Sequence, residues 1–158
     1  PSALSDFSRL FLGNVGGAIG EVSALALLAG FAYLLLRRVI GPRIPLVYMG
    51  VVFAGTALLG AAAGQTAYAP AVNGLINVMS GGLMLGAIFM ATDYTTSPVT
   101  ARGQWIYGVG LGALTVRIRL FGGYPEGVGF SILIMNLCVP LIERYLRARK
   151  YGEVKGRA

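Results

Sequence analysis

The chain has 158 residues, of which 56% are hydrophobic and only 12% are charged, and its mean hydropathy is +0.72. A soluble domain typically carries about 25% charged residues, so this composition excludes an ordinary soluble protein and indicates a membrane protein. The net charge of +7 includes a basic C-terminal tail of the kind that anchors membrane proteins at a lipid surface. It therefore requires no nucleic-acid partner, and the lipid bilayer is the first partner that we expect.

The cysteine and histidine content excludes several kinds of site. The chain has no histidine and one cysteine, Cys138. By itself it cannot build a disulfide, a Cys or His cluster for zinc, haem or iron–sulfur, or a hydrolytic triad. We expect no metal site and no catalytic residue in this chain alone.

Uncharged runs in chain order predict the membrane spans. A run over 22–36 ends at Arg37 and Arg38, and it predicts a first span near 22–36, preceded by a re-entrant piece at 10–20. Residues 44–92 contain no Asp, Glu, Lys or Arg, and a helix of that length would reach about 73 Å, more than twice the hydrocarbon core. The run must fold back at "GQTAYAPAVNG", which predicts spans near 46–63 and 72–91.

Two further runs predict spans near 103–118 and 127–143. None of these runs alternates apolar and polar residues, as a transmembrane β-barrel would require. The fold class is therefore an all-α polytopic membrane protein with about five transmembrane helices and interrupted or re-entrant segments. We expect residues 1–158 to form a single membrane domain.

Basic residues predict the orientation, because cytoplasmic loops carry an excess of Lys and Arg. The five spans place ten of the thirteen basic residues on one side, and Arg9, Arg117 and Arg119 on the other. This asymmetry predicts an N-terminus outside and a C-terminus in the cytoplasm.

Three carboxylates lie at predicted membrane boundaries and are candidates for an ion path. Glu21 and Glu126 would each open a helix, where the helix dipole favours an anion, so a capping role is an equal alternative. Asp93 would close the third span, on the unfavourable side of that dipole, unless it caps the segment that follows. Four glycine pairs have the spacing that lets membrane helices approach closely, and we expect that role for most of them: Gly16 and Gly20, Gly60 and Gly64, Gly82 and Gly86, and Gly108 and Gly112.

The polar segment "TDYTTSPVTARG" follows the uncharged run and combines a carboxylate with hydroxyl groups at a helix break. Such oxygen ligands suit a hard cation such as sodium or a proton relay, and they can equally satisfy free backbone groups. The candidate residues for an ion path or cofactor environment are Glu21, Asp93, Thr95, Thr96, Ser97, Arg102, Arg119 and Glu126. Both arginines are candidates either to hold an anionic phosphate group or to pair with Asp93 and Glu126.

Three motifs in order resemble a known family. They are "LFLGNVGGAIGEVSALALLAG" at 10–30, "GGLMLGAIFMATDYTTSPVT" at 81–100 and "IRLFGGYPEGVGFSILIMN" at 118–136. They resemble RnfD, a membrane subunit of the Rnf-type ferredoxin:NAD oxidoreductase, and, less closely, NqrB of the sodium-translocating NADH:quinone oxidoreductase. The family has about ten spans in two inverted five-helix halves, and this chain looks like the C-terminal half of a longer subunit.

The resemblance implies a subunit of a redox-driven ion translocase in a bacterial or archaeal inner membrane. Such a complex passes electrons from ferredoxin or NADH through flavins while moving sodium ions or protons outward, together with other membrane, flavin and iron–sulfur subunits. The family's covalent flavin mononucleotide (FMN) is held by a threonine that follows Gly-Ala. No threonine of this chain does so, so we expect the FMN threonine upstream of Pro1, unless the covalent site is missing. Riboflavin and Na⁺ are further expected cofactors of the whole complex.

Two alternatives from other classes remain open at this point. One is a urea-transporter-like channel or solute transporter, because inverted five-helix halves also surround a passage in those proteins. The other is a non-catalytic scaffold subunit of a membrane assembly.

Overall fold

The computed structural model is helical throughout the part of the chain that it describes. That part comprises residues 3–14, 16, 22–62, 64, 69–80, 82–122 and 127–146. The elements are α1 (Ala3–Leu12), α2 (Ala24–Leu36), α3 (Arg43–Ala62), α4 (Pro70–Met79), α5 (Leu83–Leu85), the π-helix η1 (Gly86–Met90), α6 (Ala101–Phe121) and α7 (Val128–Tyr145). The predicted all-α membrane fold class is confirmed.

Local signals in the sequence explain where the helices begin. The Ser23 hydroxyl accepts a hydrogen bond of 3.3 Å from the Ala26 amide at the start of α2. The Thr100 hydroxyl likewise accepts one of 3.1 Å from the Gly103 amide at the start of α6. Each side chain satisfies an amide that has no partner within its helix.

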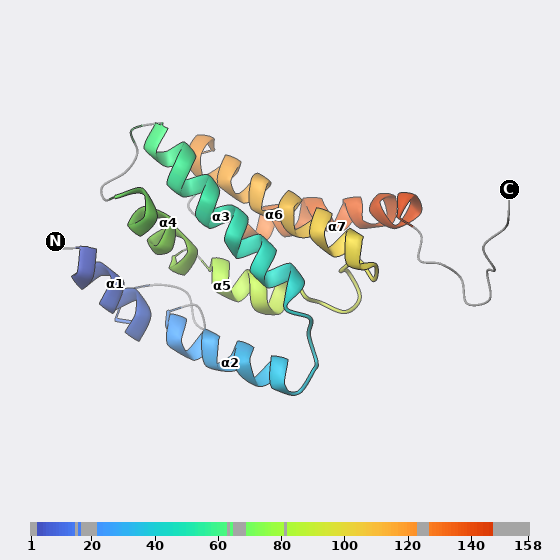
Figure 1. The fold of residues 1–158 in the computed structure, drawn as a ribbon, viewed down its shortest axis with the longest axis horizontal. Helices are drawn as coiled ribbons and strands as arrows, with labels where there is room; N and C mark the ends of the chain where they lie inside the picture. Colours follow the sequence, from blue (N-terminus) through green and yellow to red (C-terminus); the bar gives the residue numbers. More distant parts are fainter. Residues whose placement is uncertain are drawn as a thin grey trace, which may run out of the picture.

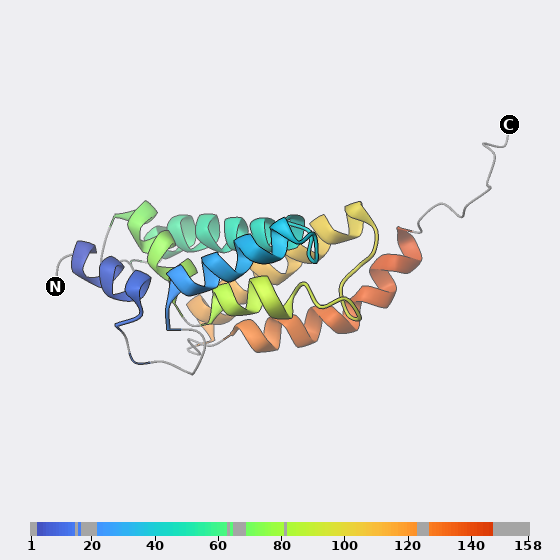
Figure 2. The ribbon, with the colours of Figure 1, turned by 90° about the horizontal axis from the view of Figure 1, so that it is seen from below.

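The core lies where α3, α5, η1, α6 and α7 meet. Its buried side chains include Tyr48, Val52, Leu83, Tyr107 and Leu111. Figures 1 and 2 show α5 and η1 between α2 and α7, while α1 lies beside α4 at the end nearest the N-terminus. A second, smaller cluster joins α2 to α5 and η1, so every described helix from α2 onward has a buried face.

Helices α3 and α6 approach closely because glycines of α6 face valines of α3. A Cβ atom added at Gly108 would lie 2.9 Å from Val47, and one at Gly112 would lie 2.5 Å from Val51. Real Cβ atoms do not come this close to a neighbour. The helix-approach role predicted for this glycine pair is therefore confirmed.

Replacing Gly112 with alanine is expected to push α3 and α6 apart. The new methyl group would overlap the Val51 side chain, and such overpacking typically costs about 1–3 kcal/mol. Thermal unfolding of the full-length subunit in detergent would measure the loss. Gly129→Ala is the control, because no atom lies within 4 Å of its added Cβ. Equal stability of both variants would contradict this close approach.

The predicted span over 72–91 is broken. Helices α4 and Leu83–Met90 meet at an angle of 66°, and Gly82 at the break has a φ of +65°, which favours glycine. Beyond the break, the Ala91 amide bonds to the Gly86 carbonyl, the five-residue spacing of a π-helix. Short π segments are frequent at functional sites, and the broken span leads directly into the polar segment.

Two helices in the described part of the chain, α3 and α7, are long and apolar enough to cross a membrane, and the bent pair makes a third if it counts as one span. Helix α2 has 13 residues, or about 20 Å, which is shorter than the hydrocarbon core. Helix α6 has 21 residues but carries three arginines. The count of five spans stays a prediction. Of the expected re-entrant piece at 10–20, residues 10–12 belong to the end of α1, and residues 15 and 17–20 lie outside the described residues.

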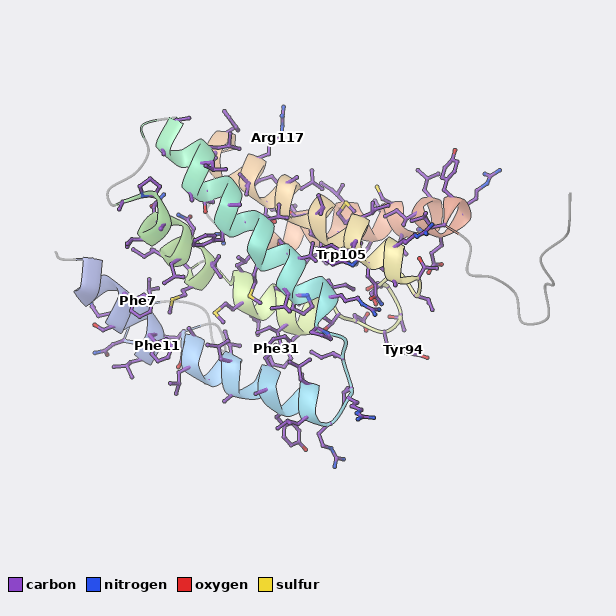
Figure 3. All side chains as sticks on the ribbon, viewed as in Figure 1. Phe7, Phe11, Phe31, Tyr94, Trp105 and Arg117 are labelled. Atoms are coloured by element: carbon purple, nitrogen blue, oxygen red, sulfur yellow. The ribbon has the colours of Figure 1, made fainter. Side chains whose placement is uncertain are left out.

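Charged helix ends gather on one side of the molecule. Figure 1 shows the last turns of α2, η1 and α7 beside the first turns of α3 and α6. We call this side the basic end, and its exposed arginines are Arg37, Arg38, Arg43, Arg102 and Arg144. The C-terminal end of α6, with Arg117, lies at the other side (Figure 3).

Candidate functional site

The polar segment forms a compact turn around the Asp93 carboxylate. The Thr95 hydroxyl donates to Asp93 Oδ2 at 2.7 Å, and the Thr96 hydroxyl donates to the same oxygen at 3.3 Å. The Ser97 amide donates to the Asp93 carbonyl at 3.0 Å. Four of the candidate residues are thus brought together by contacts within a five-residue stretch. These contacts also show how Asp93 stabilises the turn that ends the broken span.

The same contacts determine the charge of Asp93. The hydrogen bond from the Thr95 hydroxyl, together with weaker bonds from Thr96 and from the backbone, holds the pKa of Asp93 below its usual value of 3.8. A carboxylate with a lowered pKa stays ionised at neutral pH, whereas a proton carrier needs a pKa near the working pH. Asp93 is therefore a fixed negative charge at the basic end.

Helices α6 and α7 fix the far end of the polar segment. The Val99 amide donates to Glu143 Oε1 at 3.1 Å, and the Gln104 side-chain amide donates to the Pro98 carbonyl at 3.3 Å. Glu143 was missed by the sequence analysis. It is an acid in the last turn of α7, on the unfavourable side of that helix's dipole, so the argument that singled out Asp93 would also have found it.

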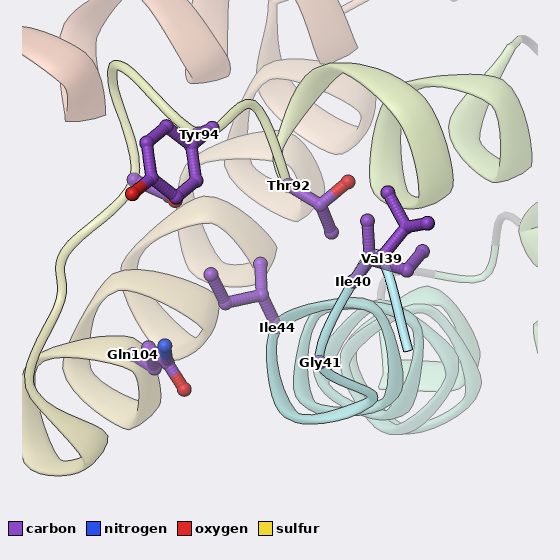
Figure 4. A pocket seen from close by; sticks show the side chains of 8 residues that line it. Val39, Ile40, Gly41, Ile44, Thr92, Tyr94 and Gln104 are labelled. Atoms are coloured by element: carbon purple, nitrogen blue, oxygen red, sulfur yellow. The ribbon is translucent and has the colours of Figure 1, made fainter. Parts of the chain in front are cut away.

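A cavity of about 140 Å³ opens between this segment and the turn that joins α2 to α3. Figure 4 shows Thr92 and Gln104, which come from the polar segment and α6, together with Val39, Ile40 and Ile44, which come from the turn after α2 and the start of α3. Tyr94 and Ser97 complete the polar side. The cavity thus has one apolar wall and one wall that carries hydroxyl and amide groups.

The two candidate arginines lie at opposite ends of α6. Arg102 is exposed in the first turn, at the basic end. Arg119 lies in the last turn and reaches to the broken span, where it donates to the Asn77 carbonyl at 2.6 Å and to the Ser80 carbonyl at 2.9 Å. Arg119 therefore satisfies carbonyls at the end of α4 that lack partners within that helix. Because Arg119 lies at the far end of α6, the structure does not bring it together with Asp93.

Two hydrogen bonds between helices, one buried and one partly buried, were also missed by the sequence analysis. The Tyr48 hydroxyl of α3 lies 2.7 Å from the Thr115 hydroxyl of α6. The Tyr107 hydroxyl of α6 donates to the Asn136 amide oxygen of α7. The two residues of each pair lie far apart in the sequence, so no local pattern reveals these bonds. Together, the two bonds connect three helices of the core.

The remaining candidate residues cannot be placed. Glu21 and Glu126 lie outside the described residues, so their roles stay predictions. Within the described ranges, no group of three or more His, Cys, Asp or Glu side chains is positioned to hold a metal ion. The oxygen atoms nearest the Asp93 carboxylate are those of Thr95 and Thr96, which donate hydrogen bonds to it.

Together, the apolar helices, the broken span and the polar turn define a multi-pass helical membrane protein with charged groups at one end. Residues 2–152 match the model of the NQR2, RnfD, RnfE family. The chain belongs to this family, and the resemblance inferred from the three motifs is confirmed.

Three relatives support this assignment. The D subunit of the Na⁺-translocating ferredoxin:NAD⁺ oxidoreductase complex of Acetobacterium woodii is 48% identical over 155 residues, which cover 98% of the chain and 45% of that relative. The proton-translocating counterpart of Clostridium ljungdahlii is 44% identical, over 92% of the chain and 43% of the relative. The corresponding protein of the ion-translocating oxidoreductase complex of Stutzerimonas stutzeri is 46% identical, over 90% and 39%. The chain spans less than half the length of these relatives.

Proposed function

We propose that this chain is part of the membrane subunit of a redox-driven ion translocase, which couples ferredoxin:NAD⁺ oxidoreduction to the movement of sodium ions or protons. The observation that carries the proposal is the 48% identity, over nearly the whole chain, to the D subunit of such a complex. The broken span supports it, because interrupted helices expose backbone groups to ions within a membrane. The other subunits of the complex are the expected partners.

Deleting the gene and restoring it tests this function. Membranes without the full-length subunit should lose ferredoxin-dependent NAD⁺ reduction and the ion gradient that accompanies it, and the restored gene should recover both. A complex that keeps both activities without the subunit would contradict the proposal. Ion uptake that needs no electron donor would instead indicate a channel.

Within this function, Asp93 is the proposed cation-attracting group on the ion path. It is ionised at neutral pH, and bonds from Thr95 and Thr96 further favour the charged form. Thr92, Ser97 and Gln104, which carry side-chain oxygen atoms, line the neighbouring cavity. Hard cations prefer such oxygen ligands. The lowered pKa of Asp93 supports cation attraction over proton carriage by the carboxylate itself. The relatives include both sodium-translocating and proton-translocating complexes, so the ion must be measured.

The redox cofactor is proposed to be FMN held covalently upstream of Pro1, with riboflavin as a further cofactor of the complex. This proposal rests on family membership and on the lack of any threonine that follows Gly-Ala in this chain. A fluorescent band from the full-length subunit after denaturing electrophoresis would support covalent FMN. A band that retains its fluorescence when only the present segment is expressed would contradict the upstream position.

The basic end is proposed to face the cytoplasm of a bacterial or archaeal inner membrane, with the N-terminus outside. The structure supports this by bringing exposed arginines from the ends of α2, α3, α6 and α7 to one side, the side that the positive-inside rule places in the cytoplasm. The flavin upstream of Pro1 would then lie near the outer face.

Cysteine labelling tests this orientation. In a Cys138→Ser background, Gly41→Cys and Gly152→Cys should resist a membrane-impermeant reagent on intact cells, and they should react after the cells are opened. Gly41 suits the test because no atom lies within 4 Å of an added Cβ. Ala62→Cys, at the exposed end of α3, is the control that should react from outside. Labelling of position 41 on intact cells would reverse the orientation.

A further inference from the structure

The basic end carries more positive charge than its acids can offset. Its five arginines are exposed, and none of them makes an ion pair with a residue that the structure describes. The two acids on this side are already engaged, since Asp93 accepts hydrogen bonds from Thr95 and Glu143 accepts one from Val99. Positive charges from several separate segments are therefore left facing outward at one edge of the molecule.

Arg38 has a left-handed backbone conformation, which favours glycine. Its φ is 54°, and it occupies the left-handed position that ends α2, where the Arg38 amide bonds to the Leu35 carbonyl and the Val39 amide bonds to the Leu34 carbonyl. Glycine is the usual residue at this position, because a side chain there is strained. An arginine kept in a strained position suggests a use for its side chain.

The cavity at this edge provides an amphipathic surface beside the arginines. Arg38 directly precedes Val39, and Arg43 directly precedes Ile44, both of which line the apolar wall. Leu36 and Val39 are 83% and 65% exposed, so apolar side chains at the end of α2 are available to a lipid. Tyr94, 95% exposed, lies on the polar side, and tyrosine is typical of membrane interfaces.

We propose that this edge is a binding site for an anionic phospholipid. The phosphate lies against Arg37, Arg38 and Arg43, and the apolar part of the lipid follows Val39 and Leu36 along α2. Arginine suits phosphate because its planar group donates several hydrogen bonds at once. The hydroxyl and amide groups of the cavity face the polar part of the head group.

Charge and polarity together favour a lipid over other anionic partners. An acidic protein surface would satisfy the arginines but would leave the exposed Leu36 and Val39 side chains without an apolar partner. Free phosphate would satisfy the charge and would likewise make no use of the apolar wall. A phospholipid matches both halves of the surface, and basic pockets beside membrane helices recognise such head groups.

Lipid titration of the intact complex, containing the full-length subunit, tests the site. Phosphatidylglycerol is added to the complex in neutral detergent, and native mass spectrometry counts the bound lipid, with phosphatidylcholine and inorganic phosphate as comparison probes. We expect Arg37→Gln, Arg38→Gln and Arg43→Gln each to lower the affinity for phosphatidylglycerol by about fivefold. Arg117→Gln, an exposed arginine at the other side of the molecule, should leave it unchanged.

Arg38→Gly separates lipid binding from folding. Glycine fits the backbone conformation at this position, so the variant should unfold at the same or a higher temperature while its affinity for phosphatidylglycerol falls.

Four results would each overturn the proposal. They are unchanged affinity in the arginine variants, an equal fall of affinity in Arg117→Gln, equal binding of phosphatidylcholine, and competition by inorganic phosphate. Loss of another subunit from these variants with full lipid retention would indicate protein docking instead. No measurement here depends on electron transfer, so the result is independent of the proposed function.

Discussion

Replacing Asp93 with asparagine is expected to leave a folded, flavin-containing complex that takes up fewer ions per electron transferred. Asparagine keeps the shape of the side chain and can still accept the bond that the Thr95 hydroxyl donates. It removes the negative charge, which the lowered pKa of Asp93 maintains at neutral pH. A water-exposed unit charge changes the local attraction of a cation by roughly fivefold, so half-maximal uptake should require about five times more sodium. Ion uptake per electron in liposomes, measured over several sodium concentrations, gives both quantities.

Thr95→Val is the matched control for this variant. Valine has nearly the same shape as threonine and removes the 2.7 Å hydrogen bond to Asp93 Oδ2, yet it leaves the carboxylate charged. If Asp93 serves only to hold its turn, both variants should lower stability and leave the ion-to-electron ratio unchanged. If the charge attracts the ion, only Asp93→Asn should change the ratio and its sodium dependence. An unchanged ratio in both variants would leave Asp93 with a structural role alone.

Replacing Arg119 with methionine is expected to destabilise the protein by about 3 kcal/mol, since one hydrogen bond from a charged donor contributes about 1.5–3 kcal/mol. The variant loses the bonds to the Asn77 and Ser80 carbonyls and leaves the Asn77 carbonyl with only the longer bond from the Ser80 hydroxyl, at 3.4 Å. Methionine retains the unbranched apolar stem of the side chain, so the loss reports mainly on the guanidinium group. Denaturant unfolding of the full-length subunit in detergent would measure it.

Two further arginine variants make this test specific. Arg117→Met removes a neighbouring, exposed arginine of the same helix, and it should change stability by less than about 0.5 kcal/mol. The stability of Arg119→Lys should lie between those of Arg119→Met and Arg117→Met, because an ammonium group keeps the charge but lacks the planar guanidinium group that reaches two carbonyls. Equal stability of Arg119→Met and Arg117→Met would show that the break in the helix does not depend on Arg119.

The helix break illustrates how far the sequence predicts this fold. The uncharged run over 44–92 had to fold back because a continuous helix would exceed the membrane, and the structure indeed separates α3 from α4. The second break, at Gly82, was not predicted at that position, because glycines near 81–82 are equally compatible with close helix packing. Only the contact with Arg119, which lies more than thirty residues further along the chain, shows how the carbonyls at the break are satisfied.

In the candidate site, too, some contacts could be predicted from the sequence, whereas others depend on the tertiary structure. The hydroxyl groups around Asp93 belong to its own turn, so sequence alone could bring Asp93, Thr95, Thr96 and Ser97 together. The contact of Glu143 with the Val99 amide and the cavity could not be found this way, since they depend on α7 and on the turn after α2 reaching the same edge. Glu21 and Glu126 remain candidates on sequence grounds alone.

By itself, the sequence determined the membrane class, the helical fold and the family, because apolar composition, run length and short motifs are local properties of the chain. The close approach of α3 and α6 was also foreseeable from the spacing of Gly108 and Gly112. Only the tertiary structure decided that Arg119 serves the end of α4 and that Arg102 lies with the other arginines at the basic end. The reason is physical: a long polar side chain bonds to whichever groups helix packing brings within its reach, and no local pattern along the chain records that packing.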